Sequence, residues 1–136
     1  MYLHQNELTI RDALPADALL LCRWWNDGKV MEHAGFPQGL GTSVEKITHQ
    51  LLEPNDPTHR LIIEAEGLPI GEMNWRREES DHAEIGIKIC ETDCQNHGIG
   101  RKVLSLLIGW LFKNGYSKII LDTNLNNTRA QHVYES

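Results

Sequence analysis

Residues 82–113 constrain the fold of this chain more than any other stretch of its 136 residues. Residues 82–90 alternate between apolar and polar side chains, which is typical of a β-strand with one buried face. Residues 95–100 (QNHGIG) follow and contain two glycines. From Val103 to Phe112, apolar residues recur in steps of three and four, which predicts an amphipathic helix. A strand, a glycine-rich turn and a helix in this order indicate an α/β fold.

The rest of the sequence predicts further elements around this unit. Pro15 suits a first helical turn, Thr42 and Glu45 form a capping-box pattern, and Glu66-Gly67 marks a hairpin turn. Helices are expected at residues 15–25, 42–52, 103–112 and 126–134. Strands are expected at residues 8–10, 61–65, 70–75, 82–90 and 119–121. The order β-α-α-β-β-β-α-β-α, without repeats or linkers, predicts a single α/β domain over residues 1–136.

The composition is that of an ordinary globular domain without a basic face. Hydrophobic residues make up 40% and charged residues 24%, with a formal net charge of −6 and a pI near 5.6. Nucleic-acid binders usually carry a basic surface, so this balance argues against nucleic acid as a partner. No apolar run approaches the roughly 20 residues that cross a bilayer, which argues against a membrane partner.

The chain has three cysteines, Cys22, Cys90 and Cys94. An odd number, with an N-terminus that lacks the layout of a secretory leader, argues against a disulfide framework and for a cytoplasmic location. Cys90, Cys94, His82 and His97 could form a Cys₂His₂ metal set, but zinc modules usually pair their histidines at close spacing. We therefore expect no metal, and the zinc site is a less favoured alternative.

The QNHGIG turn predicts an anion site. The first N–H groups of a helix have no intrahelical acceptor, and the helix dipole adds partial positive charge there. Glycine lets the backbone approach a phosphate closely. Arg101 and Lys102 oppose the dipole, which makes more sense if an anion binds beside them. The alternative is a glycine-eased turn that packs the strand on the helix.

Three motifs together resemble those of the GNAT-type N-acetyltransferase superfamily. The first is the Q-x-x-G-x-G pattern of residues 95–100 between a strand and a long helix, which is similar to the family's acetyl-CoA motif. The second is N-x-x-A-x-x-x-Y-E at residues 127–135. The third is Glu84, which precedes Gln95 by eleven residues (95 − 84), a spacing similar to that of a catalytic glutamate in one branch of the family.

The resemblance implies a mixed, mostly antiparallel sheet with splayed strands, flanked by helices. Family members usually continue past the second motif with two more strands, so we expect a sheet that lacks the last two strands. An uncovered edge strand is prone to pair with another chain. A homodimer, formed by strand exchange, is therefore one interpretation, and a chain fragment is another.

The resemblance also implies which residues bind acetyl-CoA. The strand before the turn would pair its free backbone groups with the pantetheine arm, and the turn and helix start would hold the pyrophosphate. Asn127 matches a family residue that touches the cofactor arm, although it also suits a helix N-cap. The residues expected to bind acetyl-CoA are Ile87, Lys88, Ile89, Gln95, His97, Gly98, Ile99, Gly100, Arg101 and Asn127.

Two residues match catalytic roles. Glu84 would take a proton from the acceptor amine, directly or through water; alternatively it is a solvated carboxylate on a polar strand face. A backbone N–H near Ile87 would stabilise the developing oxyanion. Tyr134 would protonate the leaving thiolate of CoA, and its alternative role is that of a core aromatic with a satisfied hydroxyl. No covalent enzyme intermediate is required.

The sequence therefore predicts an acetyl-CoA-dependent N-acetyltransferase that acts on a primary amine by direct attack in a ternary complex. The sequence does not distinguish between a small-molecule amine and a peptide amine as the acceptor. Residues 24–41, with Trp24, Trp25, His33 and Phe36, either shape the acceptor site or simply pack a helix and a loop. The alternative function is a non-catalytic CoA-binding or interaction domain of the same fold.

Overall fold

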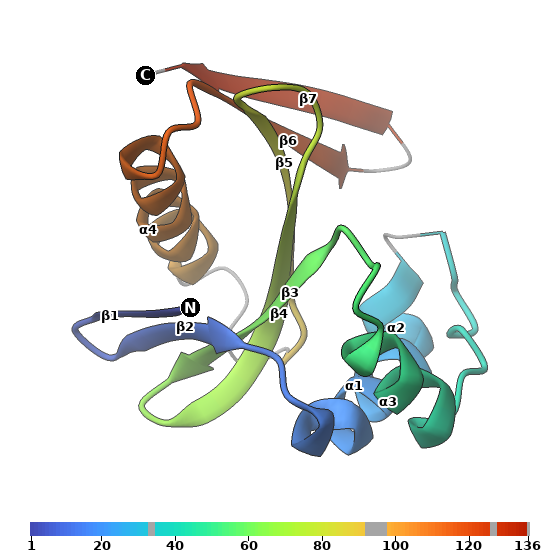
Figure 1. Cartoon of the computed structure of the whole chain (residues 1–136). Coiled ribbons are helices and arrows are strands. Elements are labelled where there is room, and N and C mark those ends of the chain that lie inside the picture. Colours follow the sequence, from blue (N-terminus) through green and yellow to red (C-terminus); the bar gives the residue numbers. More distant parts are fainter. Residues whose placement is uncertain (33–34, 92–97, 126–127, 136) are drawn as a thin grey trace. The chain divides into compact units, whose positions relative to one another are not determined.

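The computed structural model describes residues 1–32, 35–91, 98–125 and 128–135 (Figure 1). The strands are β1 (Tyr2–Gln5), β2 (Leu8–Asp12), β3 (His59–Ala65), β4 (Leu68–Arg77), β5 (His82–Ile89), β6 (Lys118–Leu125) and β7 (Thr128–Glu135). The helices are the 3-10 turn η1 (Pro15–Asp17), α1 (Ala18–Trp25), α2 (Gly28–Met31), α3 (Val44–Leu52) and α4 (Ile99–Lys113).

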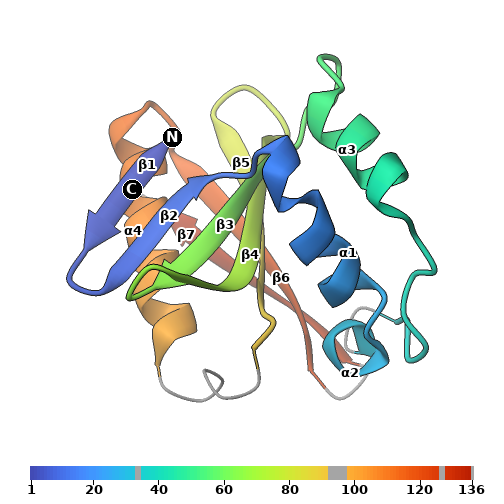
Figure 2. The same ribbon diagram turned by 90° about the horizontal axis from the view of Figure 1, so that it is seen from below.

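The strands form one sheet in the order β1-β2-β3-β4-β5-β6-β7 (Figure 2). Strands β1 to β5 pair antiparallel with their neighbours, and β5 pairs parallel with β6. The parallel register runs from His82 opposite Lys118 to Ile85 opposite Leu121. The parallel step requires a crossover connection, and α4 provides it. The predicted fold class, a mixed and mostly antiparallel α/β sheet with helices, is confirmed.

The chain divides into two compact units. The first comprises residues 1–12, 57–123 and 131–136, and the second comprises residues 13–56 and 124–130. The first unit contains most of the sheet and α4. The second unit contains η1 and the helices α1, α2 and α3.

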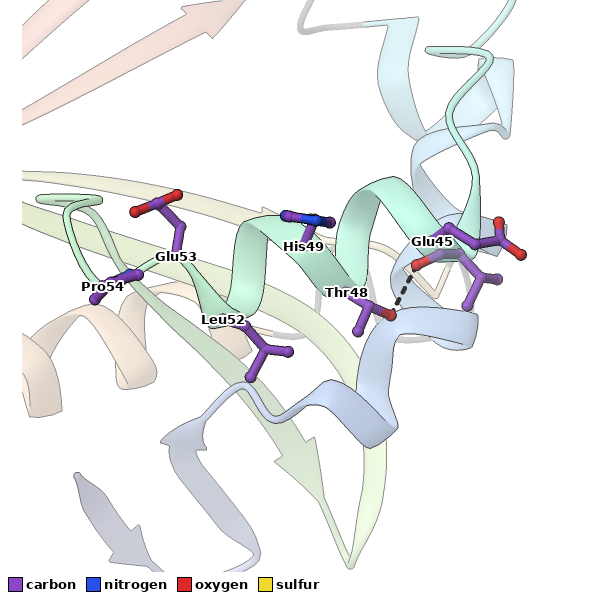
Figure 3. A pocket seen from close by; sticks show the side chains of 7 residues that line it. Glu45, Thr48, His49, Leu52, Glu53 and Pro54 are labelled. Atoms are coloured by element: carbon purple, nitrogen blue, oxygen red, sulfur yellow. Dashed lines mark hydrogen bonds between the residues drawn. The ribbon is translucent and has the colours of Figure 1, made fainter.

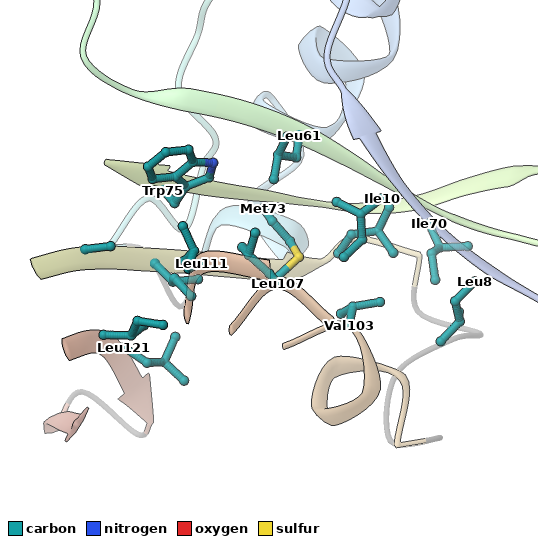
Figure 4. Packing of buried hydrophobic residues seen from close by; sticks show 14 residues of the cluster. Leu8, Ile10, Leu61, Ile70, Met73, Trp75, Val103, Leu107, Leu111 and Leu121 are labelled. Atoms are coloured by element: carbon teal, nitrogen blue, oxygen red, sulfur yellow. The ribbon is translucent and has the colours of Figure 1, made fainter. Parts of the chain in front are cut away.

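The core of the first unit lies between the sheet and α4 (Figure 4). Val103, Leu107 and Leu111 of α4 are fully buried and recur at steps of four, so they form one stripe of the helix. They pack against alternate residues of the strands, of which Ile85 and Met73 are 1% exposed. This alternation explains why the sequence of β5 switches between apolar and polar residues.

The second unit has its own buried residues and a clamp that fixes its loop. Trp24 and Trp25 of α1 are buried. The Asn26 amide accepts from the N–H of Thr42 at 2.8 Å and donates to its C=O at 2.9 Å. Gly39 has a φ of +82°, and a Cβ there would lie 2.3 Å from the carbonyl oxygen of Asn26. A glycine is therefore required where the loop passes the end of α1.

Two local predictions need correction, and one strand was not predicted. Residues 128–134 belong to strand β7 and not to a helix, because the chain there extends alongside β6. The N-cap of α3 is Ser43 and not Thr42, since the Ser43 hydroxyl accepts the Lys46 N–H at 3.2 Å. Strand β1 was not predicted; it forms a hairpin with β2 through a turn in which Asn6 has a φ of 56°.

Candidate functional site

The backbone N–H and C=O groups of successive β5 residues point alternately toward β4 and toward β6. The Cys90 N–H donates to the Ile70 carbonyl of β4 at 2.8 Å. Successive residues of an antiparallel ladder direct their N–H and C=O groups to opposite neighbours. The groups of Lys88 therefore face β4, whereas those of Ile87 and Ile89 face the β6 side. Of the three β5 residues predicted to bind the pantetheine arm, two direct their backbone groups away from β4.

A cavity of about 610 Å³ lies beside these residues in the first unit. Strand β5 provides one wall, α4 provides another, and one side chain comes from β7. The structure thus brings five of the predicted site residues together from three separate elements. The lining residues are Ile87, Ile89, Gly100, Arg101, Leu104, Ser105, Ile108 and Tyr134.

The start of α4 forms the end of this cavity. Gly98 is the N-cap, with a φ of 75° and a ψ of 4°, a left-handed conformation that glycine adopts at little cost. Because the N-cap residue is a glycine, it has no side chain of its own to cap the helix. A Cβ on Gly100 would meet only Ile87 Cδ1, at 3.9 Å, so the backbone stays approachable. Arg101 is exposed in the first turn. These features are those of an anion-binding helix N-terminus.

Several predicted residues are not part of this cavity in the described structure. Ile99 is half-buried against the core. Gln95, His97 and Asn127 lie outside the described residues. Their assignment to acetyl-CoA binding stays a prediction.

Three cavity residues, Leu104, Ser105 and Ile108, were not among the predicted site residues. They follow Arg101 at steps of three, four and seven, which places all four on one face of α4. The signal was present in the sequence, because the apolar residues of α4 fall into two stripes. Leu104 and Ile108 were predicted only as part of the amphipathic pattern, although the fully buried stripe consists of Val103, Leu107 and Leu111.

The predicted base, Glu84, lies on the opposite face of β5 from Ile87 and Ile89. Arg76 of β4 places Nη2 at 3.8 Å from Glu84 Oε2 and donates from Nε to Glu78 Oε1 at 2.7 Å. Hydrogen bonding with the neighbouring Glu84 and Arg76 side chains lowers the pKa of the Glu78 carboxyl. The Glu84 side chain is 35% exposed, so a substrate can reach it.

Lys88 shares this polar face. Its ammonium lies 3.7 Å from Glu72 Oε1 of β4. Both its backbone and its side chain therefore interact with β4. The structure does not bring Lys88 into the cavity.

Tyr134 enters the cavity from β7. Its side chain is exposed by 37%, so it is not the fully packed core aromatic that was the alternative interpretation. A phenol at this position can donate a proton to a group bound between β5 and α4. Strand β6 lies between the strands that carry Tyr134 and Glu84.

Cysteine and metal chemistry find little support in the described part of the chain. Burial raises the pKa of the Cys90 thiol well above its ordinary range, so Cys90 stays protonated and unreactive. No group of three metal-ligating side chains occurs within residues 1–32, 35–91 and the described segments that follow. Cys94 and His97, two members of the alternative zinc set, lie outside those residues.

A second cavity, of about 440 Å³, lies along α3 in the second unit (Figure 3). It is lined by Val44, Glu45, Thr48, His49, Leu52, Glu53 and Pro54. Trp24 and Trp25 are 2% and 7% exposed, and Phe36 is 45% exposed. The two tryptophans therefore serve packing, and only Phe36 is accessible among the described aromatic residues proposed for the acceptor site.

Where the structure describes helices, none is both long and apolar enough to span a membrane.

Comparisons with known proteins agree with this geometry. A family model described as an acetyltransferase (GNAT) domain matches residues 7–136. An N-acetyltransferase 9-like protein from Caenorhabditis briggsae is 33% identical over 72 residues, which are 52% of this chain and 36% of that relative. The match thus spans little more than a third of the relative's length.

Solved structures share the fold. The aminoglycoside acetyltransferase AAC(6')-Ib in complex with coenzyme A has a TM-score of 0.73 and 21% identity, over 88% of this chain and 76% of that one. The same enzyme with paromomycin and acetyl-CoA has a TM-score of 0.74 and 21% identity, over 90% and 76%. A domain from Methanocaldococcus jannaschii has a TM-score of 0.73 and 24% identity, over 90% and 81%.

Proposed function

This chain belongs to the GNAT acetyltransferase family, and on that premise we propose that it transfers the acetyl group of acetyl-CoA to a primary amine. The observation that carries the proposal is the cavity that joins the β6-facing edge of β5, the start of α4 and Tyr134. Structural relatives of the same fold bind coenzyme A or acetyl-CoA. The proposed reaction is a direct attack in a ternary complex.

The residues present fit acetyl-CoA as the co-substrate. The N–H groups at Gly98 to Arg101 suit a pyrophosphate, since they combine a glycine-lined approach with positive charge. The edge groups of Ile87 and Ile89 suit the amides of the pantetheine arm. Leu104 and Ile108 add an apolar wall on α4, and Ser105 adds a hydroxyl between them.

The proposed chemistry divides between three groups of the chain. Glu84 takes the proton that makes an ammonium a nucleophilic amine. The Ile87 N–H donates to the thioester oxygen as that oxygen gains negative charge during attack. Tyr134 gives its proton to the departing sulfur. The nitrogen–carbon bond forms as the carbon–sulfur bond breaks, and the products are an amide, CoA thiol and one released proton.

The acceptor is proposed as an amine of a small molecule or a peptide. AAC(6')-Ib has been solved with ribostamycin and with paromomycin, which are aminoglycosides, and such amines are one class to test. We further propose that residues 1–136 act as one acetyltransferase domain in the cytoplasm. A homodimer, and the absence of nucleic-acid, membrane and metal partners, stay predictions.

Calorimetric titration of the 136-residue chain with acetyl-CoA tests the proposal. We expect one site per chain in the wild type and a loss of at least 100-fold in affinity for Gly100→Trp, because the indole would fill the approach to the helix start. Gly109→Trp is the matched control: Gly109 lies in the same helix, and a Cβ there meets no atom within 4 Å. We expect Gly109→Trp to bind like the wild type.

Three outcomes are distinguishable. Folded wild-type protein that does not bind acetyl-CoA refutes the proposal. Binding without transfer to any amine favours the alternative, a non-catalytic CoA-binding domain. Equal loss in both glycine variants places the site elsewhere than at the start of α4.

A further inference from the structure

Asn74 of β4 lies directly opposite Gly86 of β5. A Cβ on Gly86 would lie 3.0 Å from Asn74 Nδ2, 3.1 Å from Oδ1 and 3.3 Å from Cγ. The amide of Asn74 therefore lies face-on against the glycine and takes the space that a side chain would need. Any larger residue than glycine at position 86 would displace it.

The Asn74 amide is the exception in a row of paired side chains. On one side along the strands, Lys88 lies 3.7 Å from Glu72. On the other side, Arg76 lies 3.8 Å from Glu84. Among the residues that the structure describes, the Asn74 amide has no hydrogen bond. It is half-buried, so both its carbonyl oxygen and its N–H₂ group can still bind a ligand.

This amide lies beside the stretch of β5 that carries the proposed chemistry. Gly86 directly precedes Ile87, whose N–H faces β6 and is proposed to hold the thioester oxygen. Glu84 precedes Gly86 by two residues, so its side chain is on the same face of the sheet as Asn74. Diagonal neighbours on adjacent strands are about 7–8 Å apart. The polar ends of two such side chains can approach more closely, and one nitrogen atom can bridge oxygens up to about 6 Å apart, since each hydrogen bond spans about 3 Å.

We propose that Asn74 orients the acceptor amine. Its amide oxygen accepts one N–H of the amine while Glu84 takes the proton that the ammonium loses. The lone pair left by that proton is then directed at the thioester carbon beside Ile87. This inference rests on the proposed acetyltransferase function and adds a residue that binds the acceptor but not acetyl-CoA.

The test separates the amide oxygen from the space that it fills. Asn74→Leu keeps a side chain of similar size but removes both polar atoms. Asn74→Asp keeps an oxygen that can accept from the amine. Asn114→Ala is the matched control, because this amide only donates to the Trp110 carbonyl at the end of α4. The probes are kanamycin A, spermidine and an alanyl tripeptide amide, each with acetyl-CoA.

We expect Asn74→Leu to lower kcat/KM for the amine by 10- to 100-fold. The loss should come from a higher KM for the amine, because the variant loses a hydrogen bond to a charged or polar partner. Its dissociation constant for acetyl-CoA should stay within twofold of the wild type. Asn74→Asp should recover most of the loss, and Asn114→Ala should show none. An Asn74→Leu variant with unchanged amine KM, or with an equal loss in acetyl-CoA affinity, overturns the inference.

A second measurement covers the case in which no probe is acetylated. The side-chain N–H₂ signals of Asn74, assigned by their absence in Asn74→Asp, are followed by NMR while each amine is added to the protein with CoA. Saturable shifts of these signals support the inference, and no shift with all three probes overturns it. If the wild type fails to bind acetyl-CoA, the proposed function itself has failed, which the calorimetric titration reveals separately.

Discussion

The two faces of β5 differ in the groups that they contact. On the apolar face, Ile85 is sealed against α4, whereas Ile87 and Ile89 are half-buried and line a cavity. On the polar face, Glu84 and Lys88 interact with charged residues of β4. One strand can therefore hold the acetyl donor on one side and present a base to the amine on the other. The backbone N–H of Ile87 lies in the plane of the sheet, between these two faces.

The largest expected effect tests the polar face. Glu84→Gln should lower kcat by about 10²–10⁴-fold with the best amine substrate, because general-base catalysis typically contributes that much. Its affinity for acetyl-CoA, measured by calorimetry, should not change, since we propose that the donor binds on the other face. Glu72→Gln removes a carboxylate from the same face and should change kcat by only a few fold. Equal losses in the two variants would mean that the face needs negative charge but no particular base.

The next prediction tests the apolar side through two leucines of α4. Leu107 is fully buried and Leu104 is half-buried at the cavity. Leu107→Ala should lower the free energy of unfolding by about 2–5 kcal/mol, as large-to-small core substitutions do. Leu104→Ala should cost about 1 kcal/mol, as is common for less buried sites, but weaken acetyl-CoA binding. Urea unfolding and calorimetry measure the two effects, and similar stability losses would contradict the division of α4 into two stripes.

The comparison of stripes shows what the sequence could predict. The period of residues 103–112 predicted the helix and its contact with the sheet, because burial of a stripe is a local property of the pattern. It could not separate Leu104 from Leu107, since both are leucines in the same amphipathic helix. Only the position of β5 and Tyr134 relative to α4 makes one of them a cavity residue.

Strand β7 shows where the local sequence pattern predicts the wrong element. Ala130, Val133 and Tyr134 share a face in a helix, and the local pattern favoured one. Strand formation depends on a neighbouring strand, here β6, and that pairing is not encoded in a local period.

Asn74 is a third case: its sequence context marks only a strand. Its role is inferred from Gly86, which is twelve residues away (86 − 74) and becomes its neighbour only through the antiparallel register.

A smaller effect tests whether Tyr134 belongs functionally to the apolar side. Tyr134→Phe should lower kcat by about tenfold, because the thiol of CoA, with a pKa near that of cysteine, leaves without much help from an acid. Acetyl-CoA affinity should change little, as the ring remains in the cavity. The variant Tyr116→Phe is the control, since Tyr116 packs edge-on against Trp75 in the core. A kcat equal to the wild type in Tyr134→Phe would leave the proton to come from water.

The smallest effect concerns the point at which the parallel pair of strands begins. Ser117, just before β6, donates from its hydroxyl to the Asp81 carboxylate and from its N–H to the Asp81 carbonyl at 2.9 Å. The hydroxyl contact lowers the pKa of Asp81 below its ordinary value of 3.8. A folded-state pKa below the unfolded one stabilises the protein above pH 4, and this stabilisation is lost as the pH falls through the folded value.

Ser117→Ala should therefore lower the melting temperature slightly at pH 7, and the gap to the wild type should narrow as the pH falls below 4. The effect is small because Asp81 is largely solvated. Ser105→Ala, which removes a hydroxyl from the exposed cavity face of α4, should show no such pH dependence. A gap that stays constant from pH 7 to pH 3 would mean that Ser117 acts by packing.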